Sequence, residues 1–331
     1  MKAMIYQRYG PPDVLEMADL PTPIPAPDEL LVAVHAATVT TADMRLRGAD
    51  FPGGLGLVGR LMTGLTRPRK PVLGGEFSGV VQALGTQATG FSPGQAVFGF
   101  AGFGAHAGFL TIKAAGPVLP RPGGLSHAQA AALPFGSLCA LVFLRDYARL
   151  KAGDNVAVLG ASGGVGCYGV QIAVAMGARV TGVASAGNAE LVRSLGAAEA
   201  VDYRAEDITD RLGQFDVIFD CVGATRFAQA RRALKPGGVY LPLEFGLADL
   251  WPALVSRLRG GPRMLLGVNG DKKQDLAEIS AMVDSGQLRP VIDRSYPLDC
   301  AADAHAYVMG RHRKGSVVLS VRDTGDAAAG E

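Results

Sequence analysis

The stretch NVAVLGASGGVGCYGVQIAVAMGARVTGVASAGN, from Asn155 to Asn188, constrains the fold more than any other part of the chain. It begins with a short apolar run at 156–159, which is typical of a buried parallel strand. A glycine-rich segment at 161–166 follows, then apolar residues at helical spacing, then a second apolar run at 179–184. This order predicts a strand, a tight turn, a helix and a parallel strand.

The glycine-rich turn has a spacing that suits an anion. Backbone amides at such a turn and at the helix N-terminus meet a negative group, most often a pyrophosphate. The spacing is AxGxxG, because Ala161 stands where the dinucleotide fingerprint usually has glycine. A purely structural strand-turn-helix unit is the alternative. The predicted cofactor-binding residues here are Ser162, Gly163, Gly164 and Val165.

Composition bounds the class of protein. The chain has 331 residues, of which 48% are hydrophobic and 19% charged, so it can bury a large core and form two domains. The formal net charge is +2 and no long run of one sign occurs, which argues against nucleic acid as the main partner.

Other signals concern membranes and compartments. The uncharged stretch 155–178 is long enough to cross a membrane, but its glycines, Ser162 and Gln171 favour a buried strand-helix unit. The N-terminal MKAMIYQRYG lacks the order of a secretion signal. The four cysteines lie far apart without CxxC spacing, so a disulfide framework or structural zinc site is not expected. We expect a cytoplasmic protein with no membrane partner.

The pattern of elements changes along the chain. Short strand-like runs dominate the first third and favour a β-rich barrel or sandwich. From His127 onward helices and strands alternate, with strands expected at 156–159, 179–184, 216–220 and 238–243, which predicts a doubly wound parallel sheet. A helix at 301–309 and a strand at 316–321 are expected to return to the β-rich part. Disorder is expected after Asp323.

Several motifs together resemble the medium-chain dehydrogenase/reductase superfamily, in its zinc-independent, quinone-oxidoreductase-like branch. They include YGPPDVLE, PVLGGEFSGVVQALG, AAALPFGSLCAL, KAGDNVAVLGASGGVG, FDCVG, LKPGGVY and GQLRPVIDRSYPL. The resemblance runs from Met1 to about Val321. It implies a GroES-like substrate domain, 1–126 and 286–331, and a Rossmann dinucleotide-binding domain, 127–285.

The resemblance also raises the question of a catalytic zinc ion. Zinc-dependent relatives carry Cys and His at the positions that are Thr40 and Gly75 here, and no four-Cys lobe follows Phe103. Threonine and glycine cannot replace thiolate and imidazole as ligands, so no metal is expected. Without a Lewis acid, hydride addition to a quinone or an activated C=C bond is favoured over alcohol oxidation.

The expected cofactor is NADPH. An acid at the end of the second strand would bind the ribose hydroxyls of NADH and repel a 2′-phosphate, and the segment 184–188 has none. Ser185 and Asn188 can donate hydrogen bonds to a phosphate. Tyr203 and Arg311 match positions that reach the adenosine phosphate in the family.

Further cofactor contacts follow from the resemblance alone. Cys139 matches a position beside the nicotinamide, although a small buried apolar residue is the alternative. Asn269, in LLGVNG, resembles a loop near the nicotinamide, with a plain turn residue as the alternative. The remaining predicted contacts of this kind are Cys221, Val222, Leu243 and Val268.

The candidates for catalysis and substrate binding are few. Thr40 and Asp43 are the predicted catalytic residues, Thr40 also contacting the cofactor. A helix N-cap is an equal alternative for Asp43. The proton is expected from water or from Thr40. An apolar wall for a small-molecule substrate is predicted from Phe51, Phe135, Phe245 and Trp251.

The leading hypothesis is an NADPH-dependent, zinc-independent reductase of quinones or α,β-unsaturated carbonyls, with a role in secondary metabolism. A zinc-free NAD(P)-dependent alcohol dehydrogenase and a non-catalytic NADPH-binding protein are the alternatives. A homodimer is also expected, because the apolar stretch 240–258 holds large side chains near the expected sheet edge. In the alternative, Leu250, Leu254 and Leu258 face their own domain.

Overall fold

The computed structural model describes residues 1–322, so the tail for which disorder was expected lies outside the described residues. The chain divides into two compact units. The β-rich unit comprises Met1–Phe51, Gly56–Phe135 and the chain from Asp271 onward, and the parallel-sheet unit comprises Pro52–Leu55 and Gly136–Gly270. The functional boundaries inferred from the sequence stay a prediction, although α9 (Lys273–Asp284) falls in the β-rich unit.

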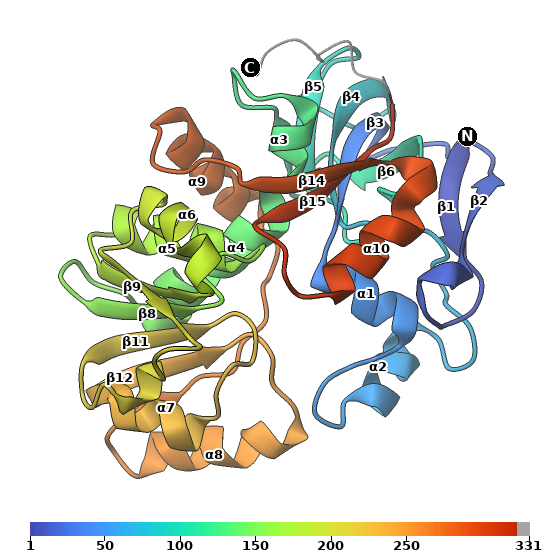
Figure 1. The fold of residues 1–331 in the computed structure, drawn as a ribbon. Coiled ribbons are helices and arrows are strands. Elements are labelled where there is room, and N and C mark those ends of the chain that lie inside the picture. Colours follow the sequence, from blue (N-terminus) through green and yellow to red (C-terminus); the bar gives the residue numbers. More distant parts are fainter. Residues whose placement is uncertain (323–331) are drawn as a thin grey trace. The chain divides into compact units, whose positions relative to one another are not determined.

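The parallel-sheet unit is built on one six-stranded sheet (Figure 1). Its strands are β8 (Asn155–Leu159), β9 (Arg179–Ala184), β10 (Glu199–Asp202), β11 (Phe215–Asp220), β12 (Leu234–Pro242) and β13 (Arg263–Met264). All neighbours pair in parallel, in the order β10-β9-β8-β11-β12-β13. This is the doubly wound order with its reversal between β8 and β11, so the predicted Rossmann-type sheet is confirmed.

Helices connect these strands on both faces of the sheet. They are α4 (Pro134–Val142) with a π-helical continuation at Phe143–Ala148, α5 (Gly166–Ala175), α6 (Ala189–Ser194), α7 (Phe227–Ala233) and α8 (Leu247–Leu258). Right-handed crossovers place α5 and α6 on one face, and α7 and α8 on the other (Figure 1). Short 3-10 turns lie at Ala186–Asn188 and Ile208–Asp210.

One helical run is long and apolar enough to cross a membrane by length and composition. It extends over His127–Ala148 and has a mean hydropathy of 1.5 in its most apolar window. Of that window, 83% is buried inside the protein, as in the core helix of a globular domain.

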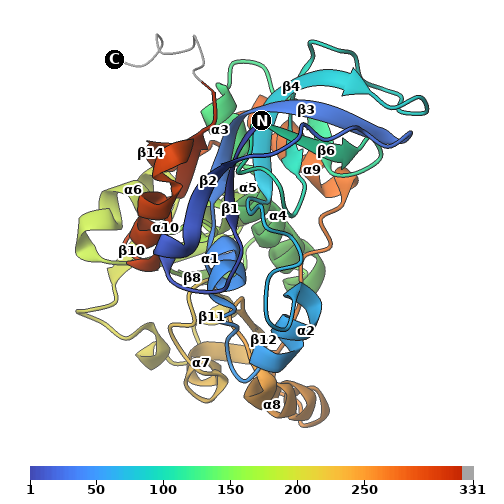
Figure 2. The same cartoon turned by 90° about the vertical axis from the view of Figure 1, so that its right-hand side faces the viewer.

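The β-rich unit contains a seven-stranded sheet and a separate hairpin. The hairpin pairs β1 (Lys2–Tyr6) with β2 (Leu15–Asp19). The sheet strands are β3 (Glu29–Val39), β4 (Glu76–Leu84), β5 (Ala96–Phe100), β6 (Phe109–Lys113), β7 (Val118–Pro120), β14 (Ile292–Pro297) and β15 (Ser316–Ser320). The long strand β3 pairs with β4, β6 and β15, and Figure 2 shows it beside β4 and β6. The predicted C-terminal strand thus joins the β-rich part through β15.

Helices α1 (Thr41–Gly48), α2 (Gly56–Thr63), α3 (His127–Ala131), α9 and α10 (Ala301–Met309) complete this unit, with 3-10 turns at Pro12–Val14 and Leu298–Cys300. Its core is formed by apolar side chains from the strands and from α10, among them Phe77, Leu30 and Val308. The predicted β-rich, GroES-like fold class is confirmed for this unit.

Candidate functional site

The glycine turn lies between the end of β8 and the start of α5, at the carboxyl edge of the parallel sheet. Gly160 has a φ of 74°, a conformation that favours glycine. A Cβ on Gly166 would collide with the carbonyl oxygen of Gly160, and one on Gly136 with that of Gly164. The missing side chains therefore let the backbone close tightly. The amides of Gly163 and Cys167 donate within this segment, to the backbone oxygens of Gly160 (2.9 Å) and Gly163 (3.1 Å).

Two predicted cofactor residues are joined by a hydrogen bond beside this turn. Asn188 donates from Nδ2 to Oγ of Ser162 over 2.9 Å, and both side chains are buried. Ser185 accepts at its backbone oxygen from the amide of Asn188. The loop after β9 is thereby fixed against the glycine turn, and it contains no carboxylate at 184–188.

A cation near this loop was missed in the sequence analysis. Tyr203 follows β10, is 52% exposed, and donates its backbone amide to Ala184 at the end of β9. The guanidinium of Arg204 lies over the Tyr203 ring, with Cζ 5.6 Å from the ring centroid. The sequence signal for Arg204 was that it is a basic residue next to Tyr203 in VDYR. Only the pairing of β10 with β9 shows that it lies near the end of β9.

The loop after β11 is held by a buried carboxylate, Asp220. It accepts hydrogen bonds from the amides of Val222, Ala224 and Thr225 at 3.0–3.1 Å, and from the Tyr240 hydroxyl at 3.0 Å. Burial, followed by the charge of Asp220, raises the pKa of Tyr240 well above its usual range. Asp220 was not among the predicted site residues, because its partners come from two separate segments.

Asp220 positions two predicted cofactor residues, Cys221 and Val222. The Val222 side chain packs against Gly160, where a Cβ would meet its Cγ1. Burial raises the pKa of the Cys221 thiol well above its usual range, so this thiol is not activated as a nucleophile. Cys139 is buried in α4, and Leu243 donates its amide to the backbone oxygen of Asp220 over 2.9 Å.

The LLGVNG loop is supported by Tyr147. Its hydroxyl donates to the backbone oxygen of Val268 over 3.1 Å, and its ring lies against Gly267. Val268 itself is 72% exposed. The roles predicted for Val268 and Asn269 stay predictions.

In the β-rich unit, Thr40 and Asp43 form a capping box at the start of α1. Thr40 donates its amide (2.8 Å) and its hydroxyl (2.6 Å) to Oδ2 of Asp43, whose own amide donates to Oγ1 of Thr40 over 3.3 Å. The other carboxylate oxygen accepts from the amide of Gly74 at 2.9 Å. Asp43 therefore holds Thr40 and the segment before β4 in place. The N-cap of α1 is Thr40 and Asp43 is its N3 residue, so the alternative that made Asp43 the N-cap was wrong about the position.

A second buried carboxylate, Glu76, lies at the start of β4. It accepts from the Thr38 hydroxyl, and from the amide of Phe135 at 2.6 Å. Burial raises the pKa of Glu76 to about 7, although both hydrogen bonds act to lower it. This carboxyl was not predicted as a site residue, because its burial depends on residues far away in the sequence.

Thr40 and Gly75 stand where the family resemblance would place zinc ligands. A Cβ on Gly75 would lie 2.6 Å from the Phe100 ring, so a histidine there would have to displace that ring. Among residues 1–322, no group of three or more His, Cys, Asp or Glu side chains is placed to hold a metal ion. Thr40 and Gly75 do not fit a zinc site.

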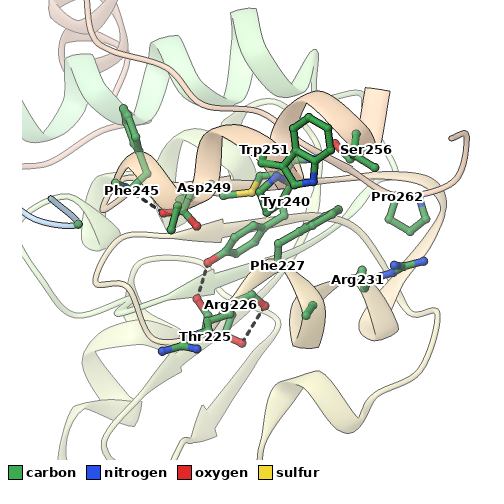
Figure 3. Close-up of a pocket in the computed structure, with 18 of the residues that line it drawn as sticks. Thr225, Arg226, Phe227, Arg231, Tyr240, Phe245, Asp249, Trp251, Ser256 and Pro262 are labelled. Carbon is green, nitrogen blue, oxygen red and sulfur yellow. Dashed lines mark hydrogen bonds between the residues drawn. The ribbon is translucent and has the colours of Figure 1, made fainter. Parts of the chain in front are cut away.

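The predicted substrate wall is divided between the two units. Phe51 packs against Gly59 of α2, and Phe135 stacks on Phe100 with ring centroids 5.9 Å apart, both in the β-rich unit. Phe245 and Trp251 line a pocket within the parallel-sheet unit. In Figure 3 Trp251 lies near Tyr240, whereas Phe245 stands apart.

Arg311 has a φ of 55° and lies in the segment between α10 and β15. Its neighbour Arg313 donates to the backbone oxygen of Val39 and to the hydroxyl of Thr41. Arg313 thus ties this segment to the end of β3. The contact predicted between Arg311 and the cofactor stays a prediction.

Two family models match the chain. The alcohol dehydrogenase GroES-like domain matches residues 26–123, and the zinc-binding dehydrogenase model matches residues 195–319.

Curated proteins and solved structures match over almost the whole chain. The mouse mitochondrial NAD(P)H oxidoreductase RTN4IP1 is 31% identical, covering 97% of this chain and 89% of the relative. An Arabidopsis thaliana chloroplastic NADPH-dependent alkenal/one oxidoreductase is 30% identical, covering 96% and 79%. The quinone oxidoreductase structure from Coxiella burnetii is 29% identical with a TM-score of 0.84, covering 97% and 99%. The chain therefore belongs to the medium-chain dehydrogenase/reductase superfamily, in its quinone-oxidoreductase-like branch.

Proposed function

We propose that this protein is an NADPH-dependent reductase of quinones or α,β-unsaturated carbonyls. The observation that carries the proposal is the glycine turn between β8 and α5. Because Gly166 has no side chain, the start of α5 can pack directly against the backbone of Gly160. The names of the relatives, an alkenal/one oxidoreductase and a quinone oxidoreductase, support this reaction class.

The residues at the carboxyl edge of the sheet fit a dinucleotide. The amides of Ser162, Gly164 and Val165 would hold the pyrophosphate, since that of Gly163 donates to the backbone oxygen of Gly160. Ser185, Asn188, Tyr203 and Arg204 would face the adenosine ribose and its phosphate. When bound, NADPH supplies the hydride. The absence of an acid at 184–188 and the presence of Arg204 favour NADPH over NADH.

The role of Thr40 follows from its hydrogen bonds. Its single hydroxyl proton is donated to Asp43, and one lone pair accepts from the Asp43 amide. The remaining lone pair is an acceptor, which suits orientation of a carboxamide N–H rather than proton donation. We assign Thr40 to orientation, Asp43 to positioning Thr40, and proton supply to water.

The reaction is proposed to need no zinc. The Phe100 ring occupies the space that a ligand at Gly75 would need, and Thr40 offers no thiolate. A quinone or enone delocalises the charge that hydride addition creates, so it depends less on a Lewis acid than a simple ketone does. The name of the matched zinc-binding family describes that family, and the residues at positions 40 and 75 of this chain support a reaction without zinc.

The test is to follow NADPH absorbance with a panel of quinones and enones, with NADH in parallel. We expect oxidation of NADPH, faster than of NADH. Turnover of alcohols with NADP and none with enones would favour an alcohol dehydrogenase. Tight NADPH binding with no oxidation by any acceptor would contradict catalysis.

A homodimer is part of the proposal. Leu250, Leu254 and Leu258 of α8 are between 52% and 78% exposed, so they do not face their own unit. Their i, i+4 spacing forms an apolar stripe that a two-fold partner would cover. Light scattering at micromolar concentration tests this, and a monomer mass would contradict it.

A cytoplasmic location is also proposed. The cysteines at 139, 167, 221 and 300 lie far apart in the sequence and show no CxxC spacing, which suits a reducing compartment. Relatives include mitochondrial and chloroplastic proteins, so cell fractionation is the test, and recovery in an organelle would contradict it.

A further inference from the structure

A pocket of about 800 Å³ lies within the parallel-sheet unit, between α7 and α8. Tyr240 of β12 and Met264 of β13 lie beneath it, and the segment around Pro262 borders one end. Its volume falls in the range of ordinary small-molecule sites. The residues assigned above to the pyrophosphate do not line it.

Aromatic side chains supply its apolar surface. Phe227 and Tyr240 stack with ring centroids 6.2 Å apart and an interplanar angle of 24°. Trp251 is 71% exposed although it lines the pocket, and Figure 3 shows its ring on the α8 side, near Tyr240 and Phe227. It is the only tryptophan in the chain.

Three arginines line the pocket. Arg226, the N-cap of α7, lies near Thr225 in Figure 3, whereas the other two lie toward the opposite end. Arg231, on α7, is drawn beside Pro262 in Figure 3, and Arg259 follows the last turn of α8. Within residues 1–322 neither guanidinium has an ion pair or hydrogen bond, whereas the neighbouring Arg232 pairs with Asp210 at 3.6 Å.

Of the two acids that line the pocket, Glu244 and Asp249, the latter lies away from Arg259 along α8. Asp249 accepts from the amide of Gly246 over 2.8 Å in the first turn of α8. At 1.5 Å per residue, it is about 15 Å along the helix from Arg259. The pocket therefore has a cationic end next to an aromatic surface.

We propose that this pocket binds an amphiphilic organic anion, with its carboxylate or phosphate at Arg231 and Arg259 and its apolar body against Phe227 and Trp251. Charge-assisted hydrogen bonds to guanidinium suit both anions. The proposal does not rest on the proposed function: it concerns the cationic end formed by Arg231 and Arg259, whereas Phe245 and Trp251 also stand in the predicted substrate wall.

Tryptophan fluorescence tests the proposal, because the signal comes from Trp251 alone. The full chain is titrated with dodecanoate, dodecyl phosphate and the neutral dodecanol. We expect a saturable change with both anions and weaker binding of dodecanol. The double variant Arg231→Ala/Arg259→Ala should bind the anions about tenfold more weakly, which corresponds to about 1.4 kcal/mol.

Arg257→Ala is the matched control, since Arg257 lies on α8 but does not line the pocket. It should bind both anions like the parent protein. Equal affinity for dodecanol and dodecanoate, or unchanged anion binding in the double variant, would overturn the proposal. The proposal would also be overturned if none of the ligands changed the fluorescence. This includes the case in which Trp251 is already shielded by a dimer.

Discussion

Glu76 makes protein stability depend on pH in a way that one substitution should remove. Its carboxyl is buried and accepts hydrogen bonds from Thr38 and from the Phe135 amide. Burial raises its pKa from 4.5 to about 7. The folded state therefore holds this proton more tightly than the unfolded chain does, and the associated stability is lost as the pH rises from about 4.5 through about 7.

The magnitude follows from the two pKa values. Between pH 5 and pH 8 the shifted pKa of Glu76 lowers the free energy of unfolding by about 2 to 3 kcal/mol. Glu76→Gln keeps the shape and an acceptor for the Phe135 amide but cannot ionise. From pH 5 to pH 8, the free energy of unfolding should therefore fall further for the parent than for Glu76→Gln, and the difference between the two decreases should equal that amount.

Urea unfolding of both proteins at pH 5, 6, 7 and 8 measures the difference, and other titrating groups cancel in the comparison. Parallel pH profiles for the parent and Glu76→Gln would refute the reasoning, because they would mean that burial does not raise the pKa of Glu76 in the folded protein.

Three further predictions concern the parallel-sheet unit. Gly166→Ala should weaken NADPH binding at least about tenfold by calorimetry, because its Cβ collides with backbone; Gly187→Ala, with open space around it, should not. Arg204→Ala should reduce the ratio of NADPH to NADH affinity about threefold or more, and an unchanged ratio would remove Arg204 from the phosphate site. Asp220→Ala should cost about 3 kcal/mol in urea unfolding, because several donors lose their acceptor, against about 1 kcal/mol for Tyr240→Phe.

The local pattern of the sequence was sufficient for the parallel sheet. The apolar runs at 156–159 and 179–184 form β8 and β9. They could be predicted because the spacing of apolar residues and the glycines that bound each element are local properties of the sequence. The two- and three-residue edge strands β13 and β7 were not predicted, since so few residues carry no periodicity.

The site was predicted less completely than the fold. The turn at 162–165 could be found from its glycines, whereas the roles of Asp220 and Glu76 depend on partners that only the tertiary structure brings close. Arg204 illustrates the same limit, because its proximity to the end of β9 arises from strand pairing.

The most direct test of the central claim is isotope transfer. NADPH deuterated at the reactive carbon of the nicotinamide is incubated with an enone and protein treated with a metal chelator, and the product is analysed by mass spectrometry. The account predicts one deuterium at the β-carbon of the product, with undiminished turnover after chelation. Product without deuterium, or activity that returns only when zinc is added, would contradict it.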